Sequence, residues 1–197
     1  MKKLFAIIVL SLLFSGNVYA DMPTTFFGIK LGSNISDYTS NDCYQCADGK
    51  SKSFNRYNLN PKEPNKDFTS YKALTTAKSK LIAAILIKGD FVYDDFKGDN
   101  TTHLNTCRSE QDNLLIAIQK KYKKDFPKLT VVKGKDNLSI IGENDTISVS
   151  LTCKPIDPDP EWKFYKKEGM IFSSKYFNLS EKENTEIGLG KTNSSGF

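Results

Sequence analysis

The chain has 197 residues and a formal net charge of +5, with 39% hydrophobic and 26% charged residues. This composition is ordinary for a globular domain and does not suggest a disordered chain, except at the C-terminal end. The small positive excess gives no argument for a nucleic-acid partner, which would need basic side chains gathered on one face.

Residues 1–20 have the organisation of a secretory signal peptide. Two lysines precede an apolar run at 4–14, and the VYA sequence at 18–20 places small residues where signal peptidase cleaves. We therefore expect a mature chain that begins at Asp21 and carries a net charge of +3. The apolar run is too short for a permanent membrane span, so the sequence predicts a bacterial periplasmic or secreted protein without an integral membrane segment.

The rest of the chain has the length of one domain. We expect a single α+β domain over residues 21–187, with a mainly antiparallel sheet and one principal amphipathic helix packed on one face. Residues 188–197, GLGKTNSSGF, lack hydrophobic periodicity and are rich in glycine and serine. They predict a flexible C-terminal tail.

The first half of the domain reads as strands separated by loops. The expected strands are at 26–32, 54–59 and 68–76, and residues 34–52 form a polar loop. The apolar run KLIAAILIKGDF at 80–91 predicts a central strand, paired with its predecessor and ended by a glycine.

The segment 106–126 has the clearest helical pattern in the chain. Thr106 is the expected N-cap, Glu110 and Asp112 stand in the early turns, and lysines crowd the last turn before a proline. Apolar residues recur at the spacing of one helical face, and Cys107 lies on that face. The lysines are interpreted as a solvated helix end, where cations meet the negative end of the macrodipole.

Three short strands are expected after this helix, at 129–132, 138–142 and 147–153. The last of them alternates strictly between apolar residues and serine or threonine, which places Cys153 on the apolar face. Cys107 and Cys153 therefore point toward the same core, and we expect them to form a disulfide. Cys43 then pairs with Cys46.

The CxxC sequence at Cys43 and Cys46 is the main alternative to a purely structural interpretation. A periplasmic thiol-disulfide oxidoreductase would use this pair, but it needs the first cysteine at a helix N-terminus, and the adjacent Asp42 opposes a thiolate. Zinc would require His103 and a third cysteine, which would break the expected core disulfide. We therefore expect no metal site and no catalytic residue at this loop.

Other motifs carry little chemistry. No nucleophile elbow, phosphate-binding loop or metalloprotease motif occurs, so no cofactor is expected. The aspartates at 90–99, around Asp94, are interpreted as a solvated acidic loop, with a hydrolase or cation site there as a third possibility. A proline-rich connection precedes Trp162 and Tyr165, which are candidates for a recognition surface, although burial of the tryptophan in the last strand is the simpler expectation.

These observations favour an exported, non-enzymatic binding or interaction protein, such as an inhibitor, an immunity-like protein or an envelope accessory protein. Its partner would be a protein or an envelope component. The oxidoreductase based on Cys43 and Cys46 is the alternative function.

Overall fold

The structure is a computed structural model that describes residues 24–65, 68–95, 102–155 and 162–194. The strands, helices and one 3-10 turn follow in chain order: β1 Thr25–Phe26, β2 Ile29–Lys30, η1 Ile35–Asp37, β3 Asn55–Leu59, β4 Ser70–Thr75, β5 Ile82–Asp95, α2 Thr102–Asp125, β6 Thr130–Lys133, β7 Asn137–Ile141, β8 Thr146–Pro155, β9 Trp162–Ser173 and α3 Ser174–Ser194.

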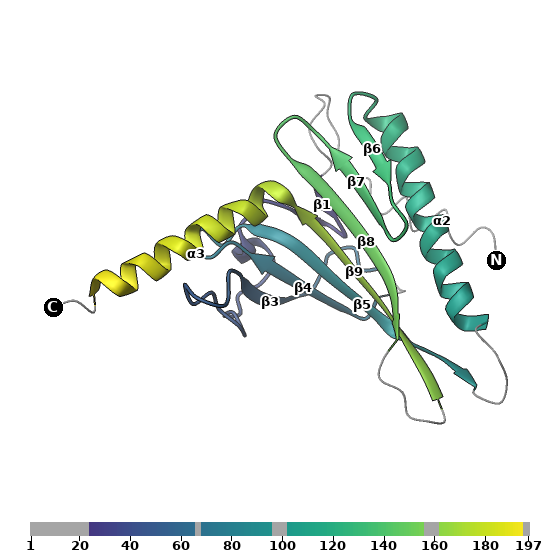
Figure 1. The fold of residues 1–197 in the computed structure, drawn as a ribbon, viewed down its shortest axis with the longest axis horizontal. Helices are drawn as coiled ribbons and strands as arrows, with labels where there is room; N and C mark the ends of the chain where they lie inside the picture. Colours follow the sequence, from purple (N-terminus) through teal and green to yellow (C-terminus); the bar gives the residue numbers. More distant parts are fainter. Residues whose placement is uncertain (1–23, 66–67, 96–101, 156–161, 195–197) are drawn as a thin grey trace.

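Strands β3 to β9 form a seven-stranded antiparallel sheet in the order β3-β4-β5-β9-β8-β7-β6. Strands β3, β4 and β5 form one consecutive group, and strands β6 to β9 form the other. The two groups are joined where β9 pairs with β5. Helix α2 runs along the β6 side of the sheet, whereas α3 leaves the opposite side and points away from α2 (Figure 1). The predicted α+β class with a mainly antiparallel sheet is confirmed.

The core lies on the face of the sheet that α2 covers, which we call the inner face. In β8, Ile147, Val149 and Leu151 are buried, and the alternating Ser148 and Ser150 lie on the outer face. The buried side of α2 packs against the inner face, and the chain around β1 and β2 adds aromatic and aliphatic residues to the same cluster. The main contributors from these two parts are Leu115, Ile118, Tyr122, Phe26, Phe27, Ile29 and Leu31.

Residues 26–32 form a small hairpin and not the single predicted strand. Phe27 and Gly28 both have positive φ values, 56° and 72°, as the two central residues of a type I′ turn require. The Phe27 side chain is buried, with its ring 5.3 Å from that of Tyr71. This packing stabilises a backbone conformation that is unfavourable for a non-glycine residue.

Strand β5 continues well beyond Gly89, where the sequence predicted its end. The pairing register with β9 shifts between Lys88 and Phe91, so an extra residue is absorbed in a bulge and the pairing then resumes. Asp94 consequently pairs with Lys163 in the sheet and does not belong to an acidic loop. Because β9 continues to pair with β5 as far as Asp95, Gly89 does not end the strand.

Helix α2 begins at Thr102, one turn before the predicted N-cap Thr106. No glycine or proline stands between 99 and 126 to stop the helix from extending in the N-terminal direction. Glu110 and Asp112 are therefore beyond the first turn and do not cap the helix. They form ion pairs with Lys167 and Lys133, respectively, and so connect α2 to the sheet.

Helix α3 is the element that the sequence did not predict. It includes residues 188–194, which were assigned to a flexible tail, while residues 195–197 lie outside the described chain. The backbones of Gly188 and Gly49 touch: a Cβ on Gly188 would lie 2.5 Å from the Gly49 carbonyl oxygen. Gly188, one of the glycines that suggested a tail, thus allows a close approach between α3 and the loop before β3.

Candidate functional site

The CxxC sequence lies at an edge of the sheet. Cys43 and Cys46 form a disulfide bond, and the two residues between them pair with Arg56 of the edge strand β3. Tyr44 N–H donates to the Arg56 carbonyl at 3.0 Å, and Arg56 N–H donates to the Gln45 carbonyl at 2.7 Å. The disulfide ring therefore holds a short stretch of backbone against β3, and exposed backbone groups of an edge strand are a known aggregation hazard.

Polar side chains fasten this cysteine loop, residues 43–53, to the rest of the fold. Asn55 accepts a hydrogen bond from Ala47 N–H at 2.9 Å and donates one to the Thr76 carbonyl at 2.9 Å. Asp48 accepts from the N–H groups of Lys52 and Lys50, and these bonds lower the pKa of Asp48 to about 2. These hydrogen bonds hold the cysteine loop in a defined conformation against the rest of the domain.

The surroundings of Cys43 differ from those of a reactive CxxC cysteine. A reactive cysteine of that kind stands at a helix N-terminus, whereas residues 43–46 have no helical backbone and Cys43 packs partly against the core. No cluster of three metal-ligating side chains occurs among the described residues. His103 belongs to the first turn of α2, and its side chain lies outside the described part of the structure.

Helix α2 shields the other edge of the sheet. Strand β6 is the terminal strand on this side, and α2 lies alongside it (Figure 1). Val131 of β6 is 6% exposed, and Lys133 forms an ion pair with Asp112 of α2. The cysteine loop thus pairs with β3 at Arg56, and α2 lies alongside β6. A face of the sheet is the larger candidate surface.

The outer face carries a shallow hollow over β5, β9 and β8. Leu86, Met170 and Ser150 stand side by side in neighbouring strands at its centre, and each is only partly buried. Lys88 and Glu168 form an ion pair beside them, with Nζ and Oε1 3.7 Å apart. This arrangement can accept apolar contact at its centre and polar contact around it.

Only one end of the outer face is covered by the described residues. The Phe177 ring from α3 packs 5.8 Å from Phe172 and 4.4 Å from Phe54. The hollow around Met170 lies closer to the start of β9 than these aromatic contacts do. Within the described part of the chain, α3 therefore covers one end of the outer face and leaves the hollow around Met170 uncovered.

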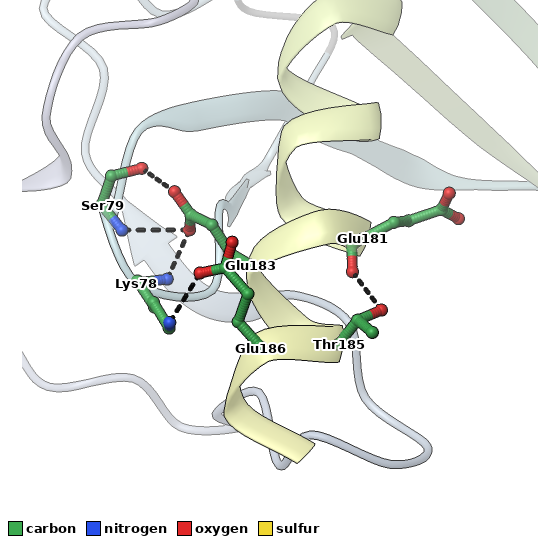
Figure 2. A network of polar contacts seen from close by, with 6 residues as sticks. All are labelled: Lys78, Ser79, Glu181, Glu183, Thr185 and Glu186. Atoms are coloured by element: carbon green, nitrogen blue, oxygen red, sulfur yellow. Dashed lines mark hydrogen bonds and ion pairs between the residues drawn. The ribbon is translucent and has the colours of Figure 1, made fainter. Parts of the chain in front are cut away.

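Helix α3 is fixed to the sheet by polar contacts. Figure 2 shows the Glu183 carboxylate facing the β4–β5 turn, where it accepts hydrogen bonds from the Ser79 hydroxyl at 2.6 Å and from the N–H groups of Lys78 and Ser79. Glu186 forms an ion pair with Lys78 at 2.7 Å. On the same helix, Asn184 accepts from Gly49 N–H at 2.9 Å.

The predicted recognition residues Trp162 and Tyr165 belong to β9. Their backbones pair with Asp95 and Val92, respectively, and their side chains lie outside the described part of the structure. Sequence reasoning missed the Leu86–Met170 hollow. A signal was present in β8, because its outward residues from Thr146 to Thr152 are all serine or threonine, but the partners in β5 and β9 become known only from the register.

Comparison with protein-family models, with curated proteins and with solved structures finds no significant match to this chain. Among the described residues, neither helix combines the length and the apolar character that a membrane span requires. Both disulfide bonds are typical of a protein that folds in an oxidising compartment.

The edge position of the cysteine loop leads to a modest stability prediction. Replacing Cys43 and Cys46 together with serine is expected to lower the free energy of unfolding by about 2 kcal/mol or less, because the disulfide closes a very short ring. Urea unfolding followed by circular dichroism measures this change. A complete loss of folding would show that the ring is indispensable, contrary to this expectation.

Proposed function

We propose that this protein is an exported, non-enzymatic binding protein that holds a macromolecular partner on the outer face of its sheet. The observation that carries the proposal is the hollow at Leu86 and Met170, which no described residue covers, in the middle of a sheet whose inner face is packed. Mixed apolar and polar surfaces of this kind occur at protein interfaces.

Export is supported by the predicted signal peptide at residues 1–20 and by the use of all four cysteines in two disulfides. In the periplasm or outside the cell, the protein has a protein or envelope component as its partner. The redox alternative is disfavoured by the backbone at Cys43, which is not at a helix N-terminus, so no helix stabilises a thiolate there.

Site-specific photo-crosslinking in the native host tests this function. A photoreactive residue in place of Ser150, inside the hollow, is expected to give a discrete crosslinked species. The same residue in place of the exposed Lys62, on the loop after β3, is expected to give none.

Two variants of Met170 make the test specific. Met170→Glu introduces a charge at the apolar centre and is expected to reduce the crosslinked species about tenfold or more, whereas Met170→Leu retains it. Equal crosslinking with both variants, or a species formed only from position 62, would refute the outer face as the binding surface. Catalysis of disulfide exchange by the purified protein would instead favour the oxidoreductase.

A further inference from the structure

Positive charge is concentrated in one short stretch of the chain. Residues 120–135 contain seven lysines and one acidic residue, Asp125, so this stretch has a net charge of +6. Because residues 21–197 together carry +3, the rest of the expected mature chain has a net charge of −3. The small net charge of the mature chain is therefore the sum of one strongly positive segment and a negative remainder.

Five of these lysines lie together at the end of α2 and in its connection to β6, which we call the lysine corner: Lys120, Lys121, Lys123, Lys124 and Lys128. Lys133 and Lys135 lie at the far end of β6, where Lys133 pairs with Asp112 in an earlier part of α2. The connection is tight, since Leu129 N–H donates to the Phe126 carbonyl at 3.0 Å and β6 begins at the next residue. Two of the seven lysines, Lys121 and Lys133, form ion pairs with aspartates. The other five are exposed and make no ion pair within the described residues: Lys120, Lys123, Lys124, Lys128 and Lys135.

The end of a helix accounts for only part of this lysine corner. The macrodipole favours cations in the last turn, which explains Lys123 and Lys124. It does not explain Lys128, which stands outside the helix in the connection to β6. Lys128 places further positive charge next to the last turn of α2, where it adds to the repulsion among the lysines and must be offset by another interaction or by solvent.

Exposed aliphatic side chains accompany these lysines. Val132 of β6 is 50% exposed and Ile141 of β7 is 41% exposed. The pairing of Val132 with Ser139 and of Thr130 with Ile141 makes the two aliphatic residues diagonal neighbours on one face of the hairpin. Thr130, the pairing partner of Ile141, is only two residues after Lys128. Flexible ammonium groups and small exposed apolar side chains suit the interfacial region of an anionic bilayer, where headgroups bind lysines and shallow apolar contact adds affinity.

We propose that the lysine corner docks on anionic phospholipid headgroups at a bilayer surface. All five of its basic residues are lysines, whose mobile point charges suit a diffuse layer of headgroups, whereas arginine is better suited to bidentate recognition of one defined anion. This docking is separate from the binding of a partner on the outer face. It would hold the protein at the surface of a membrane without any segment that crosses it.

Vesicle sedimentation with the full mature protein tests this proposal. Vesicles made of equal parts of phosphatidylglycerol and phosphatidylcholine are expected to bind the protein at low salt, and pure phosphatidylcholine vesicles are not. High salt should release it. Because a lysine near an anionic surface contributes about fivefold in affinity, replacing Lys120, Lys123, Lys124 and Lys128 with glutamine should weaken binding about tenfold or more.

A matched control removes the same charge elsewhere. Glutamine in place of the exposed Lys50, Lys52, Lys62 and Lys182 is expected to leave vesicle binding nearly unchanged. An equal loss in both variants would overturn the proposal, because net charge alone would then explain binding. Binding to soluble polyglutamate but not to the anionic vesicles would also overturn it, in favour of an acidic protein.

The lipid and partner proposals can fail independently. Met170→Glu should leave vesicle binding unchanged, since Met170 lies in the outer-face hollow and not in the lysine corner. Absence of crosslinking from position 150 with intact vesicle binding would refute only the partner surface. Crosslinking from position 150 without vesicle binding would refute only the lipid surface.

Discussion

Replacing Cys107 or Cys153 with serine is expected to lower the free energy of unfolding by about 2 to 5 kcal/mol. The disulfide joins the beginning of α2 to the end of β8 and spans 46 positions of the sequence, so its loss frees a long loop in the unfolded chain. Cys107 is only 4% exposed, so a serine hydroxyl there would also need a hydrogen-bond partner in an apolar environment. Urea unfolding of the variants measures the effect.

The double serine variant of Cys43 and Cys46 is the control for this prediction. In the chain-entropy description, its ring contributes about half as much as the long one, which contributes about 4 kcal/mol. Peptide mapping without reduction should recover a peptide that contains Cys107 linked to Cys153. Unchanged unfolding of the Cys107→Ser variant would contradict the assigned role of this disulfide.

Replacing Glu183 with glutamine is expected to destabilise the protein by about 1 to 3 kcal/mol. Glu183 is 8% exposed, and its carboxylate accepts hydrogen bonds from the Ser79 hydroxyl and from the N–H groups of Lys78 and Ser79. A glutamine amide would turn one acceptor into a donor that faces these donors. Thermal and urea unfolding at neutral pH measure the change.

The contribution of Glu183 should depend on pH with a defined sign. Burial raises the pKa of this carboxyl, but the hydrogen bonds from Ser79 and Lys78 outweigh burial and hold its pKa below the usual value. A carboxyl whose pKa is lower in the folded state stabilises that state above the unfolded pKa, about 4.3, and this contribution disappears as pH falls through the folded pKa. The difference between wild type and Glu183→Gln should therefore be full near neutral pH and decrease below about pH 4.

Glu186→Gln provides the comparison on the same helix. Glu186 binds Lys78 across an exposed ion pair, in which both side chains are about half accessible to solvent. Solvent and salt screen such a pair, so this variant should be much closer to wild type in stability than Glu183→Gln. Equal effects of the two substitutions would show that the buried carboxylate has no special role in fixing α3.

Local sequence patterns were sufficient to predict a helix or strand when one of its faces packs against the core. The alternation of Ile147, Val149 and Leu151 and the helical spacing that includes Leu115 and Ile118 predicted both elements and their buried faces. These same two patterns predicted the pairing of Cys107 with Cys153, and the structure confirms it. Burial of one face repeats along the chain with the period of the element, so it is visible in the sequence.

Tertiary contacts decided the elements that have no such period. Helix α3 is held through Ser180, Glu183 and Asn184, and its contacts lie more than one hundred positions away in the sequence. Apart from the aromatic contacts of Phe177, the buried residues on this side are polar, namely Ser180, Glu183 and Asn184, so hydrophobic periodicity gave no indication of the helix. The same reason applies to the cysteine loop and to the Leu86–Met170 hollow, because strand register and long-range hydrogen bonds bring their parts together and neighbouring residues do not encode either.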